Sequence, residues 1–182
     1  MDLIVTTVQK PSITITQMAE DIADKLSILF VPRNRNSLAT IREKYAVSEL
    51  IVAAADGPIA YTEAGEYFFH LSMAELRIKN LINGKHDHMV TAMDLAAGMT
   101  VLDCTLGLAT DAIVASFVVG ENGVITGLES SPVIALITGY GLQNFTVNSE
   151  ADITSALRRI TVEGVDYHQY LKLLPDNSFD II

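Results

Sequence analysis

A small-residue loop with a carboxylate at its mouth is the segment of this sequence best suited to binding a ligand. The predicted strand 99–104, which contains Val101 and Leu102, leads through Asp103 into a loop, and Asp111 then opens a helical pattern. In open α/β sheets a ligand lies beyond the carboxyl ends of the strands, where such a loop exposes backbone N–H groups at a helix N-terminus. We expect the ligand to approach most closely at Gly107, which has no side chain.

The composition of this loop disfavours a dinucleotide such as NAD. A dinucleotide fingerprint carries three glycines so that a pyrophosphate can lie on the helix, but Thr105 and Ala109 occupy two of those positions. The carboxylate of Asp103 would repel a pyrophosphate and attract the ammonium and sulfonium charges of S-adenosylmethionine. The loop thus predicts a cofactor that is cationic at this end, although an ordinary strand-to-helix turn with a structural Asp remains an alternative.

Glu129 supports a nucleotide-like cofactor. It follows the apolar strand 124–128 at about 20 residues beyond the loop, where an acid can accept hydrogen bonds from ribose hydroxyls. Alternatively, Glu129 is an acid at a helix N-terminus, because Ser130, Ser131 and Pro132 start the next helix. The two roles can coexist.

Asp166 is a third acid at the same predicted sheet edge. It follows the strand 159–162 and opens a helix, so its carboxylate is placed within reach of an adenine amino group, and Tyr167 could pack on that ring. A plain helix cap is the competing interpretation of Asp166.

These residues resemble the class I, Rossmann-like S-adenosylmethionine-dependent methyltransferases over residues 90–182. More narrowly, 101–116 and 127–132 are similar to a family of bacterial methyltransferases related to the small-subunit ribosomal RNA guanine-N2 methyltransferases. The first motif of that family is an Asp-x-Thr-x-Gly-x-Gly-x-Asp run. The motif matches Asp103, Thr105, Gly107 and Asp111, and departs mildly at Ala109.

The resemblance implies methyl transfer from S-adenosylmethionine to RNA, at a guanine N2 of ribosomal RNA, with positioning as the main contribution of the enzyme. Segment 70–89 also resembles the part of the family's sequence that leads into the cofactor domain. No catalytic residue can be named. The implied cofactor-binding residues are Asp103, Thr105, Gly107, Ala109, Asp111, Glu129, Ser130, Asp166 and Tyr167.

Strand and helix patterns predict an α/β protein with a small N-terminal extension, 1–85, before a cofactor-binding domain, 86–182. Strict alternation in the second part indicates a parallel, Rossmann-like sheet with right-handed crossovers. Expected in the extension are strands 3–8, 28–31 and 50–54, helices 11–26, 37–45 and 74–81, and a hairpin of 59–62 with 67–70. Expected in the domain are strands 99–104, 123–128, 159–162 and 179–182, with helices 111–119, 132–144 and 167–173.

Composition indicates a soluble, cytoplasmic protein without a metal site. The 182 residues are 49% hydrophobic, enough for a full core, and the longest mainly apolar run, 112–119, is far below the roughly 20 residues of a membrane-spanning helix. Cys104 is the single cysteine, which excludes an internal disulfide, and we expect it to be buried in its strand. His86 and His88 lie in a predicted loop with too few further ligands for a metal, so we expect surface histidines.

The net charge of −10 is unevenly distributed. Residues 1–90 contain 9 basic and 11 acidic side chains, whereas 91–182 contain 3 and 11. A polyanion such as RNA would therefore contact the first half, unless its basic residues are ordinary solvated side chains. The basic residues that cluster there are Arg33, Arg35, Arg42 and Lys44, followed later by Arg77, Lys79 and Lys85.

The sequence ends before the family's substrate-facing motif, so we expect a shortened chain that lacks the remaining strands of a seven-stranded sheet. An exposed edge strand at 179–182 and an uncovered apolar face would favour a homo-oligomer. Two other functions stay open. One is a non-catalytic module that binds S-adenosylmethionine or RNA, and the other is an NAD-dependent oxidoreductase.

Overall fold

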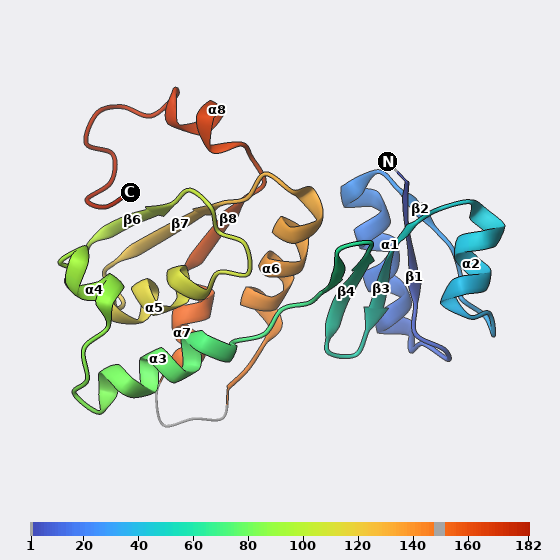
Figure 1. Cartoon of the computed structure of the whole chain (residues 1–182), viewed down its shortest axis with the longest axis horizontal. Coiled ribbons are helices and arrows are strands. Elements are labelled where there is room, and N and C mark those ends of the chain that lie inside the picture. Colours follow the sequence, from blue (N-terminus) through green and yellow to red (C-terminus); the bar gives the residue numbers. More distant parts are fainter. Residues whose placement is uncertain (1, 148–151) are drawn as a thin grey trace. The chain divides into compact units, whose positions relative to one another are not determined.

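A division between Phe69 and His70 separates two α/β units in the structure, a computed structural model that describes residues 2–147 and 152–182 (Figure 1). The sequence places its boundary later, after residue 85. The difference concerns helix α3 (Ser72–Ile82), which packs against helix α5 (Thr110–Val119) and belongs to the second unit. Ala74 and Ile78 are fully buried on this helix, and burial of apolar side chains is what ties it there.

The first unit contains one five-stranded sheet in the order β2-β1-β3-β4-β5. Strands β1, β2 and β3 are parallel, and β4 and β5 continue the sheet as antiparallel strands. All five residues of β1 are buried, as expected for a central parallel strand. The elements are β1 (Leu3–Thr7), α1 (Ile13–Leu26), β2 (Leu29–Phe30), α2 (Leu38–Tyr45), β3 (Glu49–Ala54), β4 (Gly57–Thr62) and β5 (Gly65–Tyr67).

The predicted hairpin in this unit is placed correctly, but its second strand begins earlier than expected. The prediction was 67–70, whereas β5 covers Gly65–Tyr67. The turn is tight because the Thr62 hydroxyl accepts a hydrogen bond from Ala64 N–H and donates one to the Gly65 carbonyl. Gly65 has φ +137°, a conformation that favours glycine, so the chain reverses at once.

Serine caps start both helices of the first unit. The Ser12 hydroxyl accepts a hydrogen bond from Ile15 N–H at 3.3 Å, and the Ser37 hydroxyl accepts one from Thr40 N–H at 3.0 Å. Each cap satisfies an N–H group that the first turn of a helix leaves without a partner. These local signals explain why α1 and α2 begin where the sequence indicates.

The second unit contains a parallel sheet in the order β6-β7-β8, which confirms the predicted Rossmann-like arrangement. Helices α3, α5 and α7 lie on one side of this sheet, and α8 on the other (Figure 1). Two short helices, α4 and α7, were not predicted. The remaining elements are α4 (His88–Ala92), β6 (Thr100–Asp103), β7 (Val124–Leu128), α6 (Pro132–Asn144), α7 (Ile153–Arg158), β8 (Ile160–Glu163) and α8 (Tyr167–Leu171).

The segment expected as a last strand, 179–182, pairs with β6 on the edge away from β7. It forms a single parallel bridge, between Val101 and Ile181, with a 2.9 Å hydrogen bond from Leu102 N–H to the Ile181 carbonyl. The Asp180 carboxylate anchors the segment by accepting hydrogen bonds from the N–H and the hydroxyl of Thr100, each at 2.8 Å. The chain therefore places β7 and β8 on one side of β6, and segment 179–182 then returns to the opposite side of β6.

Helix α5 is apolar around its whole circumference because it is covered on several sides. It packs against the sheet, α3 and α7, and its buried residues are Ala112, Ile113, Val114, Ala115, Ser116 and Val119. A helix without a polar face is stable in water only when it is surrounded in this way. None of the helices within 2–147 and 152–182 has the length and apolar character needed to cross a membrane.

Candidate functional site

The loop after β6 leaves the sheet at the point where the strand order reverses. Strand β7 lies on one side of β6 and the segment around Ile181 on the other, so the carboxyl end of β6 is a topological switch point. Ligands of open α/β sheets bind in the crevice beyond such a point. The structure thus places the predicted loop at the position that favours ligand binding.

The backbone of this loop turns twice through the left-handed region. Gly107 has φ +52° and Ala109 has φ +65°, and Ala109 then starts α5 without a side-chain cap. The sequence-based description of Ala109 as a mild departure from the motif needs correction. Its methyl group is small and fully buried, but a left-handed conformation strains any residue with a Cβ.

Gly107 is held from both sides by the second strand-helix unit. Its N–H donates a 3.0 Å hydrogen bond to Glu129 Oε2, and its carbonyl accepts a 2.6 Å hydrogen bond from the Thr138 hydroxyl of α6. Glu129 Oε1 accepts a further bond from Ser131 N–H at 2.8 Å. Glu129 therefore links the loop to the start of α6. Its predicted position as an acid at a helix N-terminus is observed, and its carboxylate also contacts the loop.

The close approach of the loop to β7 depends on a second glycine. A Cβ at Gly127 would lie 2.3 Å from a methyl carbon of Leu106, whose side chain is 4% exposed. Leu106 N–H also donates a 2.9 Å hydrogen bond to the Leu128 carbonyl. Leu106 therefore covers Gly127 and fixes the height of the loop above the strand.

Three carboxylates, Asp103, Asp111 and Glu129, surround the loop, and the pKa of Asp103 is raised among them. Burial is the main cause that raises the pKa of Asp103, and the negative charges of Asp111 and Glu129 raise it further. A 2.9 Å hydrogen bond from Thr105 N–H to Asp103 Oδ1 opposes this rise. A positively charged ligand group would relieve this repulsion, so the electrostatics favour a cation.

Arg77 of α3, which the sequence suggests only as a contact for a polyanion, is paired with two acids in the structure. Its guanidinium forms ion pairs with Asp87 at 2.7 Å and with Asp111 at 2.5 Å. Asp87 also caps α4 by accepting hydrogen bonds from Met89 and Val90 N–H, and Arg77 lowers the pKa of Asp87 to about 2. Arg77 therefore connects α3, α4 and the first turn of α5, a link between distant residues that no local pattern reveals.

Asp166 is the N-cap of α8 at the carboxyl end of β8. Its Oδ1 accepts hydrogen bonds from His168 N–H at 2.9 Å and Gln169 N–H at 3.3 Å. Tyr167 is 37% exposed, and its ring lies 4.1 Å from the His168 ring in a tilted arrangement. The capping interpretation is observed, and a contact of either residue with adenine stays a prediction.

The remaining site predictions have mixed outcomes. Thr105 and Ser130 are exposed beside the loop and Glu129, respectively. The prediction for Cys104 was wrong, because β6 ends at Asp103 and Cys104 is half-buried in the following turn. Burial and then Asp103 raise the pKa of this thiol, which keeps it protonated. His86 and His88 are exposed, as predicted, but His88 begins helix α4.

The basic residues predicted to face a polyanion do not form a single group of free charges. Arg77 and Lys79 are paired with acids, the latter with Glu75 at 2.7 Å. Arg42 donates to the Tyr61 carbonyl. A neutral carbonyl leaves the charge of Arg42 in place, whereas the acids paired with Arg77 and Lys79 make those two cations less available to an external anion.

Comparison with known proteins places this chain in a family. The uncharacterized protein YpiP of Bacillus subtilis (strain 168) is 34% identical over 179 residues, which cover 98% of this chain and 69% of that protein. The chain belongs to the YpiP family. No protein-family model matches it.

A solved structure shares the fold of this YpiP-family chain. The SAM-dependent methyltransferase NGO1261 from Neisseria gonorrhoeae matches with a TM-score of 0.61 at 13% sequence identity. The match covers 92% of this chain but 62% of that protein, so the chain spans less than two thirds of its length. The likeness confirms the Rossmann-like α/β fold that the sequence predicts.

Proposed function

We propose that this chain binds S-adenosylmethionine at the loop after β6 and serves in methyl transfer to RNA, at a guanine N2 of ribosomal RNA. The observation that carries the proposal is the hydrogen bond between Gly107 N–H and Glu129 Oε2. It brings the loop after one strand and the acid after the next strand to one place at the sheet edge, the arrangement suited to a nucleoside cofactor.

The residues of this site fit the chemistry of that cofactor. Asp103 is a partly buried carboxylate whose pKa is raised by burial and by its acidic neighbours, so it gains from an ammonium or sulfonium group nearby. Glu129 presents oxygens that can accept hydrogen bonds from ribose hydroxyls. Asp166 and Tyr167 follow the neighbouring strand β8 and are the residues we assign to the adenine edge and face.

When bound, the cofactor supplies an electrophilic methyl group. The chain supplies position and electrostatics, because the loop backbone is fixed at Gly107 by Glu129 and Thr138. Fixing the loop before ligand binding lowers the entropy cost of ordering it. RNA as the acceptor is supported by the resemblance at residues 101–116 and 127–132.

Calorimetric titration of the purified chain with S-adenosylhomocysteine tests the cofactor proposal. We expect binding, and we expect Glu129→Ala to weaken it about tenfold or more, as lost hydrogen bonds to a charged acceptor should. Glu121→Ala is the matched control, because Glu121 is exposed before β7, at the opposite end of that strand. Urea denaturation of Glu129→Ala in parallel separates lost ligand contacts from a disturbed loop, because Glu129 also holds the N–H groups of Gly107 and Ser131.

Titration with NAD gives the opposing outcome. Binding of NAD in place of S-adenosylhomocysteine would overturn the cofactor assignment. The acceptor is tested with labelled S-adenosylmethionine and small-subunit ribosomal RNA, followed by mass spectrometry of the nucleosides. Cofactor binding without any N2-methylguanosine would contradict the acceptor and favour a binding module.

A further inference from the structure

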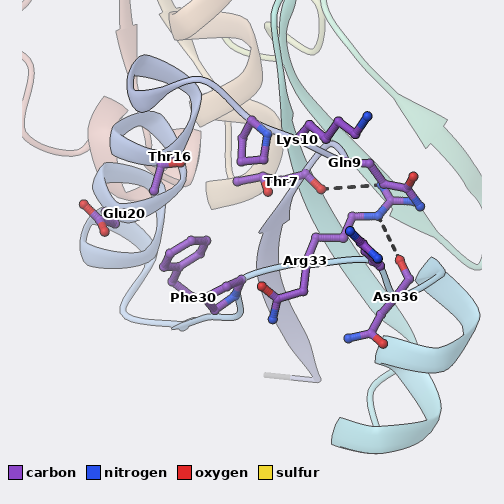
Figure 2. A pocket seen from close by; sticks show the side chains of 12 residues that line it. Thr7, Gln9, Lys10, Thr16, Glu20, Phe30, Arg33 and Asn36 are labelled. Carbon is purple, nitrogen blue, oxygen red and sulfur yellow. Dashed lines mark hydrogen bonds between the residues drawn. The ribbon is translucent and has the colours of Figure 1, made fainter.

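We infer that the first unit carries a second ligand site, a cationic pocket that binds a nucleotide of RNA through its phosphate and its base. The inference rests on the RNA acceptor proposed above and assigns it a contact surface. The pocket has a volume of about 1020 Å³ and is open to solvent (Figure 2). Its lining residues lie within 7–36, so it belongs entirely to the first unit.

The pocket lies where the strand order of the first unit reverses. From β1 the chain passes through α1 to β2 on one side, and then through α2 to β3 on the other side of β1. Thr7 at the end of β1 and Phe30 at the end of β2 both line the pocket. It therefore occupies the crevice beyond a topological switch point, the preferred ligand position in such sheets.

Arg33 is positioned by main-chain oxygens and not by an acid. Its Nε donates to the Asn36 carbonyl at 3.3 Å, and its Nη1 donates to the Thr7 carbonyl at 3.5 Å (Figure 2). Neutral carbonyls orient the guanidinium without cancelling its charge. The Arg33 N–H groups that these bonds do not use can pair with phosphate oxygens in a planar, two-point geometry.

The charge of the pocket is positive in an acidic protein. Lys10, Arg33 and Arg35 line it together with one acid, Glu20. In the described ranges, 2–147 and 152–182, none of these three cations forms an ion pair. The first turn of α1, which borders the pocket through Thr16, has no acidic residue. An excess of unpaired cations in one pocket favours an anionic ligand.

Phe30 distinguishes a nucleotide from a free phosphate. Its ring is half-exposed and lies between α1, which carries Thr16 and Glu20, and the Arg33 side chain (Figure 2). An aromatic face beside cations is the usual means of binding single-stranded nucleic acid, because every base can stack on it. Phosphate contacts by Lys10 and Arg35 and stacking on Phe30 together explain the composition of this pocket.

Fluorescence anisotropy with a labelled single-stranded RNA of about ten nucleotides tests this inference on the full chain. We expect Lys10→Gln with Arg35→Gln to weaken RNA binding about tenfold or more, because each lost cation also removes counterion release. The matched control is Lys25→Gln with Lys44→Gln, which removes the same charge from exposed positions outside the pocket. Phe30→Leu should weaken RNA binding without changing the net charge.

The possible outcomes separate this inference from the cofactor proposal. Titration of each variant with S-adenosylhomocysteine should be unchanged, and RNA binding that persists when that ligand fails to bind would sink only the cofactor proposal. Equal weakening by the pocket and control pairs would overturn the pocket, as would absence of RNA binding. Competition by inorganic phosphate at constant ionic strength, with no effect of Phe30→Leu, would overturn the nucleotide assignment.

Discussion

The two units place opposite charges at equivalent positions of similar sheets. Beyond the parallel strands β1 and β2 lie Lys10, Arg33 and Arg35, whereas beyond β6 and β7 lie Asp103 and Glu129. Both sites lie at a switch point of the strand order, so the architecture explains their location. The side chains then select the ligand, which shows why function is argued from the site and not from the fold.

The two sites also differ in how their charges are satisfied. The carboxylates of the second unit accept hydrogen bonds from loop N–H groups, as Asp103 does from Thr105 and Glu129 does from Gly107. In the cationic pocket, Arg33 donates to carbonyls, and none of Lys10, Arg33 and Arg35 forms an ion pair within the described ranges. We therefore expect substitutions in the acidic site to change stability, and substitutions in the cationic pocket to change binding alone.

The largest stability effect is expected at Gly127 in the second unit. Gly127→Ala should lower the free energy of unfolding by about 2 kcal/mol, because the new Cβ collides with the buried Leu106 side chain. Urea denaturation measures this effect. Gly139→Ala is the control, since its Cβ would meet only Val162 at 4.0 Å and alanine favours the helix. Equal stability of the two variants would show that the loop is not tied to β7.

A loss of about the same size is expected when Asp87 loses its charge. Its folded-state pKa is about 2, below the ordinary 3.8, so the ion pair with Arg77 stabilises the protein above about pH 4 and is lost as the pH falls toward 2. Asp87→Asn should cost about 2 kcal/mol at pH 7 and flatten the acid limb of stability. Asp111→Asn should cost less than about 1 kcal/mol, because that carboxylate is 65% exposed. A larger loss for Asp111→Asn than for Asp87→Asn would contradict the assignment of Asp87 as the main partner of Arg77.

Removing the charge of Asp103 should raise the free energy of unfolding, the opposite of the effect expected at Asp87. Its pKa is raised, mainly by burial, so ionisation above that pKa destabilises the fold, and lowering the pH relieves the cost. Asp103→Asn should therefore raise the free energy of unfolding at pH 7 by about 1 kcal/mol while weakening S-adenosylhomocysteine binding. Thermal unfolding and calorimetry measure the two effects, with the exposed Asp176→Asn as control. A destabilised variant would mean that the carboxylate is needed for the fold.

The smallest effect is expected in the cationic pocket. Arg35→Gln should change the free energy of unfolding by less than about 0.5 kcal/mol, since Arg35 is exposed and has no acidic partner in the described ranges. Urea denaturation at low and high salt measures it. A loss above about 1 kcal/mol would remove the contrast between the two sites.

Much of the fold follows from local signals along the chain. Ser12 and Ser37 cap α1 and α2 within two residues of the predicted helix starts at 11 and 37, and Ser131 with Pro132 starts α6 at the predicted residue. Caps and proline act within one turn, so they can be recognised without knowledge of the rest of the molecule. The position of Glu129 after β7 was predictable for the same reason, because strand, acid and helix start are contiguous.

Errors arise where a residue's state depends on distant parts of the chain. Helices α4 and α7 are too short for a periodic pattern. The left-handed conformation of Ala109 and the early end of β6 before Cys104 follow from the path of the loop over β7. Sequence spacing carries no information on such contacts.

The order of residues alone was thus sufficient for the α/β class, the loop after β6 and the acid that follows β7. It did not reveal that Arg77 joins Asp87 to Asp111, or that Lys10, Arg33 and Phe30 line one pocket. The physical reason is the distance along the sequence between the residues that interact. Helix caps, turns and strand alternation are set by neighbouring residues, whereas ion pairs and pockets are formed by side chains that only the packing of helices on sheets brings within a few ångströms.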